Sequence, residues 1–134
     1  MISPATTAFL RRVLLLDAGV SAAAGLLMAL GGQILPPLTG LSPTLLLPAG
    51  LVLLPYATFV AWVAGRPAMS APLVWTVIGA NVLWAAGSVA IILFGWVQPT
   101  LLGHVFVIGQ AAAVALFAEL QFIGLRRART VVAA

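Results

Sequence analysis

Long uncharged stretches separate a few charged positions along this chain. From Asp17 to Arg66 the sequence has 48 consecutive uncharged residues, and from Arg66 to Glu119 it has 52 more. A single helical crossing of a bilayer needs about 20 apolar residues, so each stretch is long enough for two crossings. The pattern therefore predicts an all-α integral membrane protein, a single bundle of four transmembrane helices that run up and down, with a return to the first side at Arg66.

Proline and glycine positions set the expected boundaries of the four helices. Pro4 and Pro43 each follow a serine, which is the sequence of a helix cap and first turn. Pro36 and Pro37, after two glycines, are expected to end the first helix. The predicted helices cover about 4–30, 43–64, 71–95 and 99–125. A tail follows at 126–134, of which residues 130–134 are expected to be loose.

The composition also indicates that lipid surrounds this bundle. The chain is 63% hydrophobic and 6% charged, whereas soluble domains carry about 25% charged residues. Lipid must therefore cover most of the surface, and the bilayer is the first expected partner. The net charge of +4 does not indicate nucleic-acid binding, because the basic residues form no continuous face.

The six basic residues predict an orientation. They lie near the two chain ends and in the middle hairpin, while the other two loops are uncharged, and they are Arg11, Arg12, Arg66, Arg126, Arg127 and Arg129. The positive-inside rule then places both termini in the cytoplasm, and the composition favours a multi-pass protein of the bacterial inner membrane. The first apolar run resembles a signal peptide, but Asp17 interrupts it, so we expect it to remain as a span.

Four polar residues are expected at one depth in the cytoplasmic half of the bundle. Depths are counted at about 1.5 Å per residue from the nearest arginine or, for Asn81, from Pro72 at the start of its helix. Asp17 is then roughly 8 Å deep, Glu119 roughly 10 Å, Asn81 roughly 14 Å and Tyr56 roughly 15 Å. A charge facing lipid costs several kcal/mol, so these groups should converge inward. Trp84 shares a helix stripe with Asn81 and is expected to bond in the core or to line a pocket. Two interpretations stay open, a structural hydrogen-bonded layer or a site for a ligand or a proton.

Two glutamines of the fourth helix form a separate hypothesis. Gln110 and Gln121 align with each other and lie nearly opposite Glu119 on the helix. If Glu119 points into the bundle, the two amides point out of it. That face then predicts contact with a second copy of the chain or with a membrane partner subunit.

The sequence contains no motif for catalysis, metal binding or cofactor binding. It has one histidine and no cysteine, and no nucleophile–base pair or phosphate-binding loop is present. We therefore expect a non-catalytic protein with an accessory, assembly or hydrophobic-ligand-binding role, and a membrane enzyme acting on lipid or quinone is the least favoured class.

The alternative hypothesis is a small dimeric transporter that exchanges protons for hydrophobic cations. In size and helix count the chain resembles the small multidrug exporters, which implies such an activity. That family carries a glutamate midway along its first helix, whereas here the acid of the first helix is Asp17, five residues from Arg12. The resemblance covers the layout, and Glu119 is the residue on which coupled transport is expected to depend.

Overall fold

Five helices form the part of the chain that the computed structural model describes, residues 7–133, and this part contains no strand. They are α1 (Ala8–Leu30), α2 (Leu35–Thr39), α3 (Pro43–Gly65), α4 (Ala71–Leu93) and α5 (Leu101–Ala133). The four longer helices are long and apolar enough to span a membrane, as predicted. The predicted helix start at Pro4 lies outside the described residues.

Two boundaries differ from the predicted ones for local reasons. Pro36 and Pro37 do more than end α1, because they occupy the first turns of the short helix α2, where their missing N–H groups are tolerated. The predicted end of the last helix at about 125 is wrong, since α5 continues to Ala133. The tail that is expected to be loose is therefore helical over residues 130–133, and residue 134 lies outside the described residues. No proline or glycine follows Gly124 in the sequence, so nothing in the chain stops the helix at the membrane boundary.

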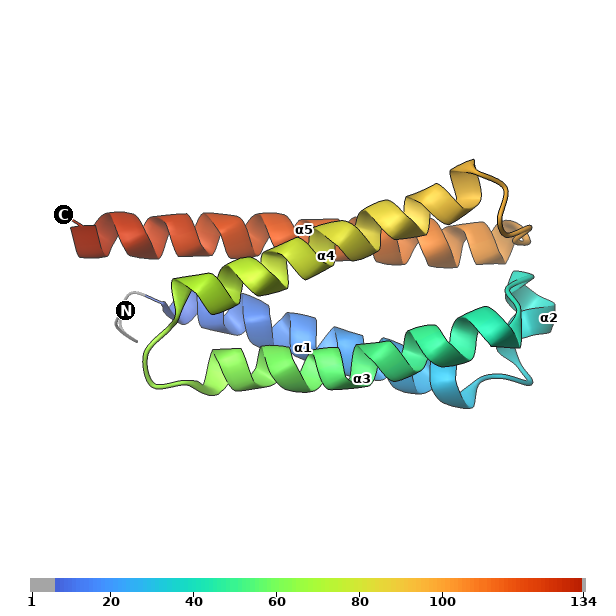
Figure 1. The fold of residues 1–134 in the computed structure, drawn as a ribbon, viewed down its shortest axis with the longest axis horizontal. Helices are drawn as coiled ribbons and strands as arrows, with labels where there is room; N and C mark the ends of the chain where they lie inside the picture. The colour runs from blue at the N-terminus through green and yellow to red at the C-terminus, as the bar shows by residue number, and fades with distance from the viewer. Residues whose placement is uncertain (1–6, 134) are drawn as a thin grey trace.

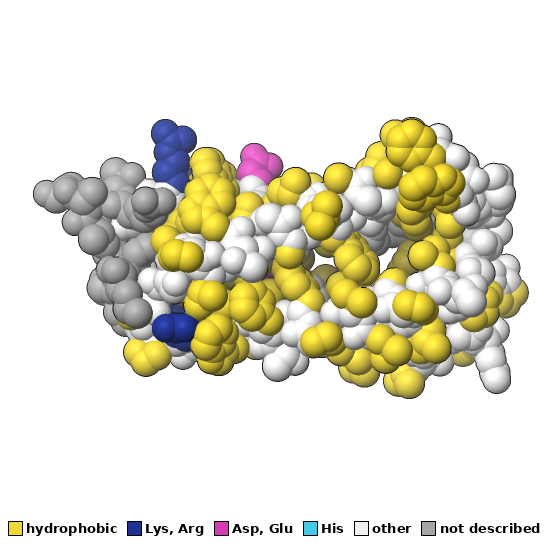
Figure 2. Space-filling view, viewed as in Figure 1, with side chains coloured by type: hydrophobic (Ala, Val, Ile, Leu, Met, Phe, Trp, Pro, Cys, Tyr) yellow, Lys and Arg dark blue, Asp and Glu magenta, His cyan; other side chains and the backbone are white. Residues whose placement is uncertain are grey.

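The long helices are arranged as two pairs, α1 beside α3 and α4 beside α5 (Figure 1). Glycines allow the first pair to approach closely: a Cβ atom at Gly50 would lie 2.7 Å from the backbone oxygen of Gly25 and 2.7 Å from the backbone nitrogen of Ala29. α1 also packs against α5, whereas α3 and α4 make few contacts with each other. The bundle is therefore open between α3 and α4 in the half away from the arginines (Figure 2), while nearer the arginines the two helices share one apolar cluster.

One end of the bundle holds the arginines together with the start of α1, the α3–α4 connection and the end of α5 (Figure 1). The Arg11 guanidinium donates hydrogen bonds to the backbone oxygens of Ala64 and Arg66, the latter at 2.8 Å. These oxygens belong to the end of α3, where helix carbonyls lack intrahelical donors. The Arg66 guanidinium in turn lies 4.9 Å from the centroid of the Trp62 ring, a cation–π contact.

At the opposite end, the loop before α5 is hydrogen-bonded to α2. The Thr100 hydroxyl donates to the Leu38 oxygen at 2.6 Å, and its backbone N–H donates to the Thr39 oxygen at 2.9 Å. Gly40 turns the chain with φ at 73°, a value that favours glycine. These bonds tie the two helix pairs together at the uncharged end.

A polar layer separates two apolar clusters in the interior. The cluster toward the arginines includes Leu14, Val60 and Val77, and the cluster toward the uncharged end includes Met28, Leu46 and Val107. The buried polar side chains between these clusters come from α1, α4 and α5, and they are Asp17, Ser21, Asn81 and Gln121.

Candidate functional site

Asp17 is the centre of the polar layer and accepts hydrogen bonds from three other helices. Its Oδ2 atom accepts from Tyr56 Oη of α3 at 3.1 Å, from Asn81 Nδ2 of α4 at 2.8 Å and from Gln121 Nε2 of α5 at 2.7 Å. Its Oδ1 atom accepts from Ser21 Oγ, one turn along α1, at 3.1 Å. A single carboxyl group thus connects all four long helices.

The layer is almost closed to the surroundings. Asp17 is 1% exposed, Gln121 0% and Asn81 3%. A carboxylate in such a place needs hydrogen bonds to replace its lost hydration, and all of its partners here are neutral donors. The cost of burial is therefore offset by amides and hydroxyls, with no basic side chain among the partners in the described part of the chain.

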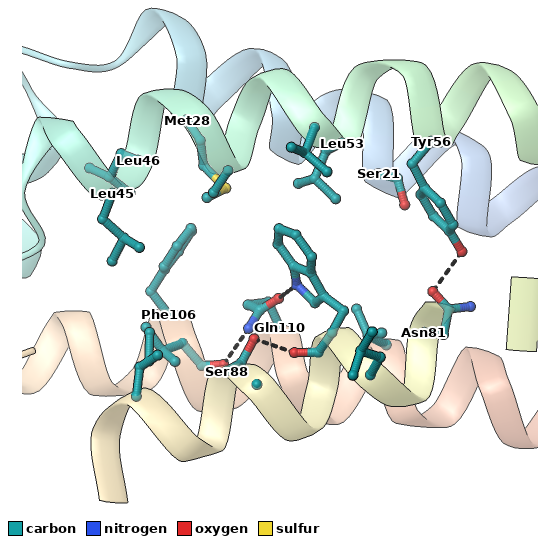
Figure 3. Close-up of a pocket in the computed structure, with 18 of the residues that line it drawn as sticks. Ser21, Met28, Leu45, Leu46, Leu53, Tyr56, Asn81, Ser88, Phe106 and Gln110 are labelled. Carbon is teal, nitrogen blue, oxygen red and sulfur yellow. Dashed lines mark hydrogen bonds between the residues drawn. The ribbon is translucent and has the colours of Figure 1, made fainter. Parts of the chain in front are cut away.

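Asn81 and Tyr56 extend the network beyond the carboxyl group. Asn81 Nδ2 also donates to Gln121 Oε1 at 3.0 Å, and Asn81 Oδ1 accepts from the Tyr56 hydroxyl at 2.7 Å. The Tyr56 hydroxyl therefore lies within hydrogen-bonding distance of two acceptors although it carries one proton. Figure 3 shows the Tyr56 hydroxyl and the Asn81 amide oxygen facing each other.

A second polar pair joins α4 to α5 nearer the uncharged end. The Trp84 indole N–H donates to Gln110 Oε1 at 2.8 Å, and Gln110 Nε2 donates to the backbone oxygen of Val107 at 2.8 Å. The Ser88 hydroxyl donates to the Trp84 backbone oxygen at 2.7 Å. The bond from the indole N–H to Gln110 holds the Trp84 ring beside α5. The ring also lines a cavity.

This cavity has a volume of about 510 Å³ and lies between the two helix pairs. Most of its wall is apolar, with Met28, Leu53 and Phe106 among the lining residues, while Tyr56 and Asn81 line one end (Figure 3). Figure 2 shows the surface hollowed in the half of the molecule away from the arginines, with apolar side chains around the hollow. Cavities of about 300–1,000 Å³ with apolar walls and a few polar groups are typical of small-molecule sites.

The structure brings together three of the four residues that the sequence predicted for the polar layer, Asp17, Asn81 and Tyr56. Trp84 lies in the cavity wall, as one of its two predicted roles requires.

The predicted inward position of Glu119 is wrong, because its side chain is exposed on the outer surface of α5. Two carboxylates in one buried layer would repel each other, whereas an amide in that place supplies the donor that Asp17 needs. Gln121 lies two residues from Glu119 and therefore about 200° away around the helix.

The predicted outward orientation of Gln110 and Gln121 is wrong for the same reason. Gln121 is fully buried against Asp17, and Gln110 lies in the cavity wall. The sequence signal that favours the inward orientation of the two glutamines is the spacing of small and apolar residues on the same face of α5. These residues include Val107, Ala111 and Ala118, which are all buried. Gln110 and Gln121 share one face of α5 with these buried residues, and Glu119 lies on the other face.

Among the described residues, no three His, Asp or Glu side chains come close enough to hold a metal ion. Comparison with protein-family models, with curated proteins and with solved structures finds no match to this chain. Fold and site together define an all-helical protein with four helices able to span a membrane, a buried polar layer and an apolar cavity beside it.

Proposed function

We propose that the protein is a multi-pass protein of the bacterial inner membrane whose four helices cross up and down with both termini in the cytoplasm. The gathering of Arg11 and Arg66 at one end of the bundle supports this orientation. A membrane-impermeant thiol reagent applied to intact cells should label Gln98→Cys at the opposite end but leave Gly65→Cys unlabelled. The reverse pattern of labelling would show that the orientation is inverted.

We propose further that the protein binds a small hydrophobic molecule without transforming it chemically. The observation that carries this proposal is the cavity of about 510 Å³. Its apolar wall suits an alkyl or ring system, and Tyr56 and Asn81 at one end suit a polar head group. The opening between α3 and α4 faces the space that lipid would occupy, so a ligand dissolved in the bilayer has direct access.

Filling the cavity should abolish binding. Gly87 lines the cavity and no atom lies within 4 Å of a Cβ built there, so Gly87→Leu should occupy the ligand's volume without a clash. We expect the wild-type chain, gently solubilised, to retain a hydrophobic molecule that native mass spectrometry detects, and Gly87→Leu to lose at least about 90% of it, a difference of about 1.4 kcal/mol or more in binding.

Gly79→Leu is the matched control on the same helix. Gly79 also has open space around its Cβ position but does not line the cavity. This variant makes the same change in helix propensity and should bind like the wild type. Equal retention by both variants would place the bound molecule outside the cavity and refute the assignment.

A second candidate function is the exchange of protons for hydrophobic cations. It is favoured by one observation, that Tyr56 and Asn81 contact both the cavity and the Asp17 carboxyl group. In sealed vesicles with a pH gradient, transport of a lipophilic cation should then be lost in Asp17→Asn and retained in Glu119→Gln. Absence of flux in correctly oriented wild-type vesicles would eliminate transport and leave ligand binding in place.

A further inference from the structure

The position of one proton distinguishes two states of the polar layer. Tyr56 Oη lies 3.1 Å from Asp17 Oδ2 and 2.7 Å from Asn81 Oδ1, yet its hydroxyl has one proton to donate. In the part of the chain that the structure describes, Asn81 Oδ1 has no other hydrogen-bond donor. Whether this oxygen is satisfied therefore depends on the direction in which the Tyr56 proton points.

The protonation of Asp17 decides that direction. When Asp17 is ionised, the Tyr56 proton is drawn to the carboxylate, since hydrogen bonds to a charged acceptor are the stronger ones. Asn81 Oδ1 is then an open acceptor at the cavity wall. When Asp17 is protonated, its O–H donates to Tyr56 Oη, the Tyr56 O–H turns to Asn81 Oδ1, and no acceptor stays open.

Among the described residues, no other charged group contacts the hydrogen-bonded set formed by Asp17, Tyr56 and Asn81. Asp17 is bonded to Ser21 on its own helix, to Tyr56 from α3, to Asn81 from α4 and to Gln121 from α5. Tyr56 is the only titratable side chain among these partners. The other carboxyl group of the chain, Glu119, is exposed on the outer surface of α5.

We propose that the cavity selects hydrophobic molecules whose head group donates a hydrogen bond to Asn81 Oδ1, and that their binding releases the proton of Asp17. This inference rests on the proposed function, because it assigns a ligand class to the same cavity. On binding, the ligand hydroxyl or ammonium donates to Asn81, Tyr56 donates to the Asp17 carboxylate, and the Asp17 proton passes to the aqueous phase. Long-chain alcohols and amines fit this chemistry, whereas ethers and esters of the same length lack the donor.

The test compares dodecanol with dodecyl methyl ether, which share the alkyl chain and differ in the donor. Affinities of the protein in detergent are measured in steps of one pH unit between two limits, about pH 9 and about pH 4, a range in which carboxyl groups of folded proteins change their protonation. We expect dodecanol to bind more tightly than the ether at the higher pH. Its affinity should fall by up to about tenfold for each unit by which the pH is lowered once free protein carries the Asp17 proton, the slope for one linked proton, while the ether should show no such slope.

Two conservative variants test whether the hydrogen bonds of the polar layer rearrange when Asp17 gains or loses its proton. Tyr56→Phe leaves Asn81 Oδ1 open at every pH, so dodecanol should bind with little pH dependence and with the higher affinity retained at low pH. Glu119→Gln removes the other carboxyl group and should keep the wild-type slope. Transfer of the pH dependence to Glu119, or its persistence in Tyr56→Phe, would overturn the proposal.

The outcomes also distinguish this inference from the proposed function. If dodecanol and the ether bind alike at both pH values and Gly87→Leu blocks both, the cavity binds hydrophobic molecules but the donor preference and proton linkage are wrong. If neither probe binds to the wild-type protein, this inference and the hydrophobic-ligand site for such chains fail together.

Discussion

Replacing Asn81 with leucine is expected to destabilise the folded bundle by about 3 kcal/mol, the upper end of the range for leaving a buried polar group without its hydrogen-bond partner. Asn81 donates to Asp17 Oδ2 at 2.8 Å and to Gln121 Oε1 at 3.0 Å, and it accepts from Tyr56 at 2.7 Å. Leucine has a similar volume but satisfies none of these groups. The penalty for a buried polar group without a partner exceeds the average value of a hydrogen bond.

Reversible unfolding in mixed detergent micelles measures this loss. Thr76→Val on the same helix is the control, because its exposed hydroxyl bonds only to the Pro72 oxygen of its own helix, and a change within about 0.5 kcal/mol is expected there. Adding Asp17→Leu to Asn81→Leu should recover part of the stability, since the second change removes the stranded carboxyl group. A similar small loss for Asn81→Leu and Thr76→Val would show that the network contributes little to folding.

The depth of the polar layer could be predicted from the sequence because it follows from helix geometry alone. Counting about 1.5 Å per residue from the arginines, and from Pro72 for Asn81, puts Asp17, Asn81 and Tyr56 close to one level. These three side chains do hydrogen-bond to one another. The cost of a polar group in hydrocarbon was sufficient to predict that they meet.

The inward face of α5 could not be predicted in the same way. For α5 taken by itself, the cost of exposing a charge to lipid favours Glu119 as the inward residue. The decision depends on what the other helices present, which is a carboxyl group at Asp17 that is better satisfied by the amide of Gln121. Such a pairing between residues 104 positions apart is a tertiary property and has no signature in the pattern of one helix.

A pocket beside Trp84 was one of the alternatives left open by the sequence, but the size and the walls of the cavity could not be predicted from it. The cavity exists because α1 and α3 pack tightly through Gly25 and Gly50 while α3 and α4 diverge toward the uncharged end (Figure 1). Hydrophobic periodicity is the same for a helix that faces lipid and one that lines a cavity. Leu53 and Phe106 are ordinary apolar residues in the sequence, and only the assembled bundle gives them a shared space.

The close approach of α1 and α3 leads to the second large effect, in which Gly50→Val is expected to lower stability by about 3 kcal/mol, the upper range for overpacking. A Cβ at position 50 would lie 2.7 Å from two backbone atoms of α1, in Gly25 and Ala29. Backbone atoms cannot move aside as a flexible side chain can, so the two helices must separate. Gly79→Val, with open space around the new side chain, makes the same chemical change and should cost less than about 1 kcal/mol.

The same variant tests whether this helix contact positions the polar layer. Tyr56 lies on α3 six residues from Gly50, which is less than two turns, so a separation of α1 from α3 should carry its hydroxyl away from Asp17. Tyr56→Phe should then cost less in the Gly50→Val background than in the wild type, and a double-mutant cycle measures the difference. Strictly additive losses would mean that the helices absorb the valine locally and that the Tyr56–Asp17 bond is set by other contacts.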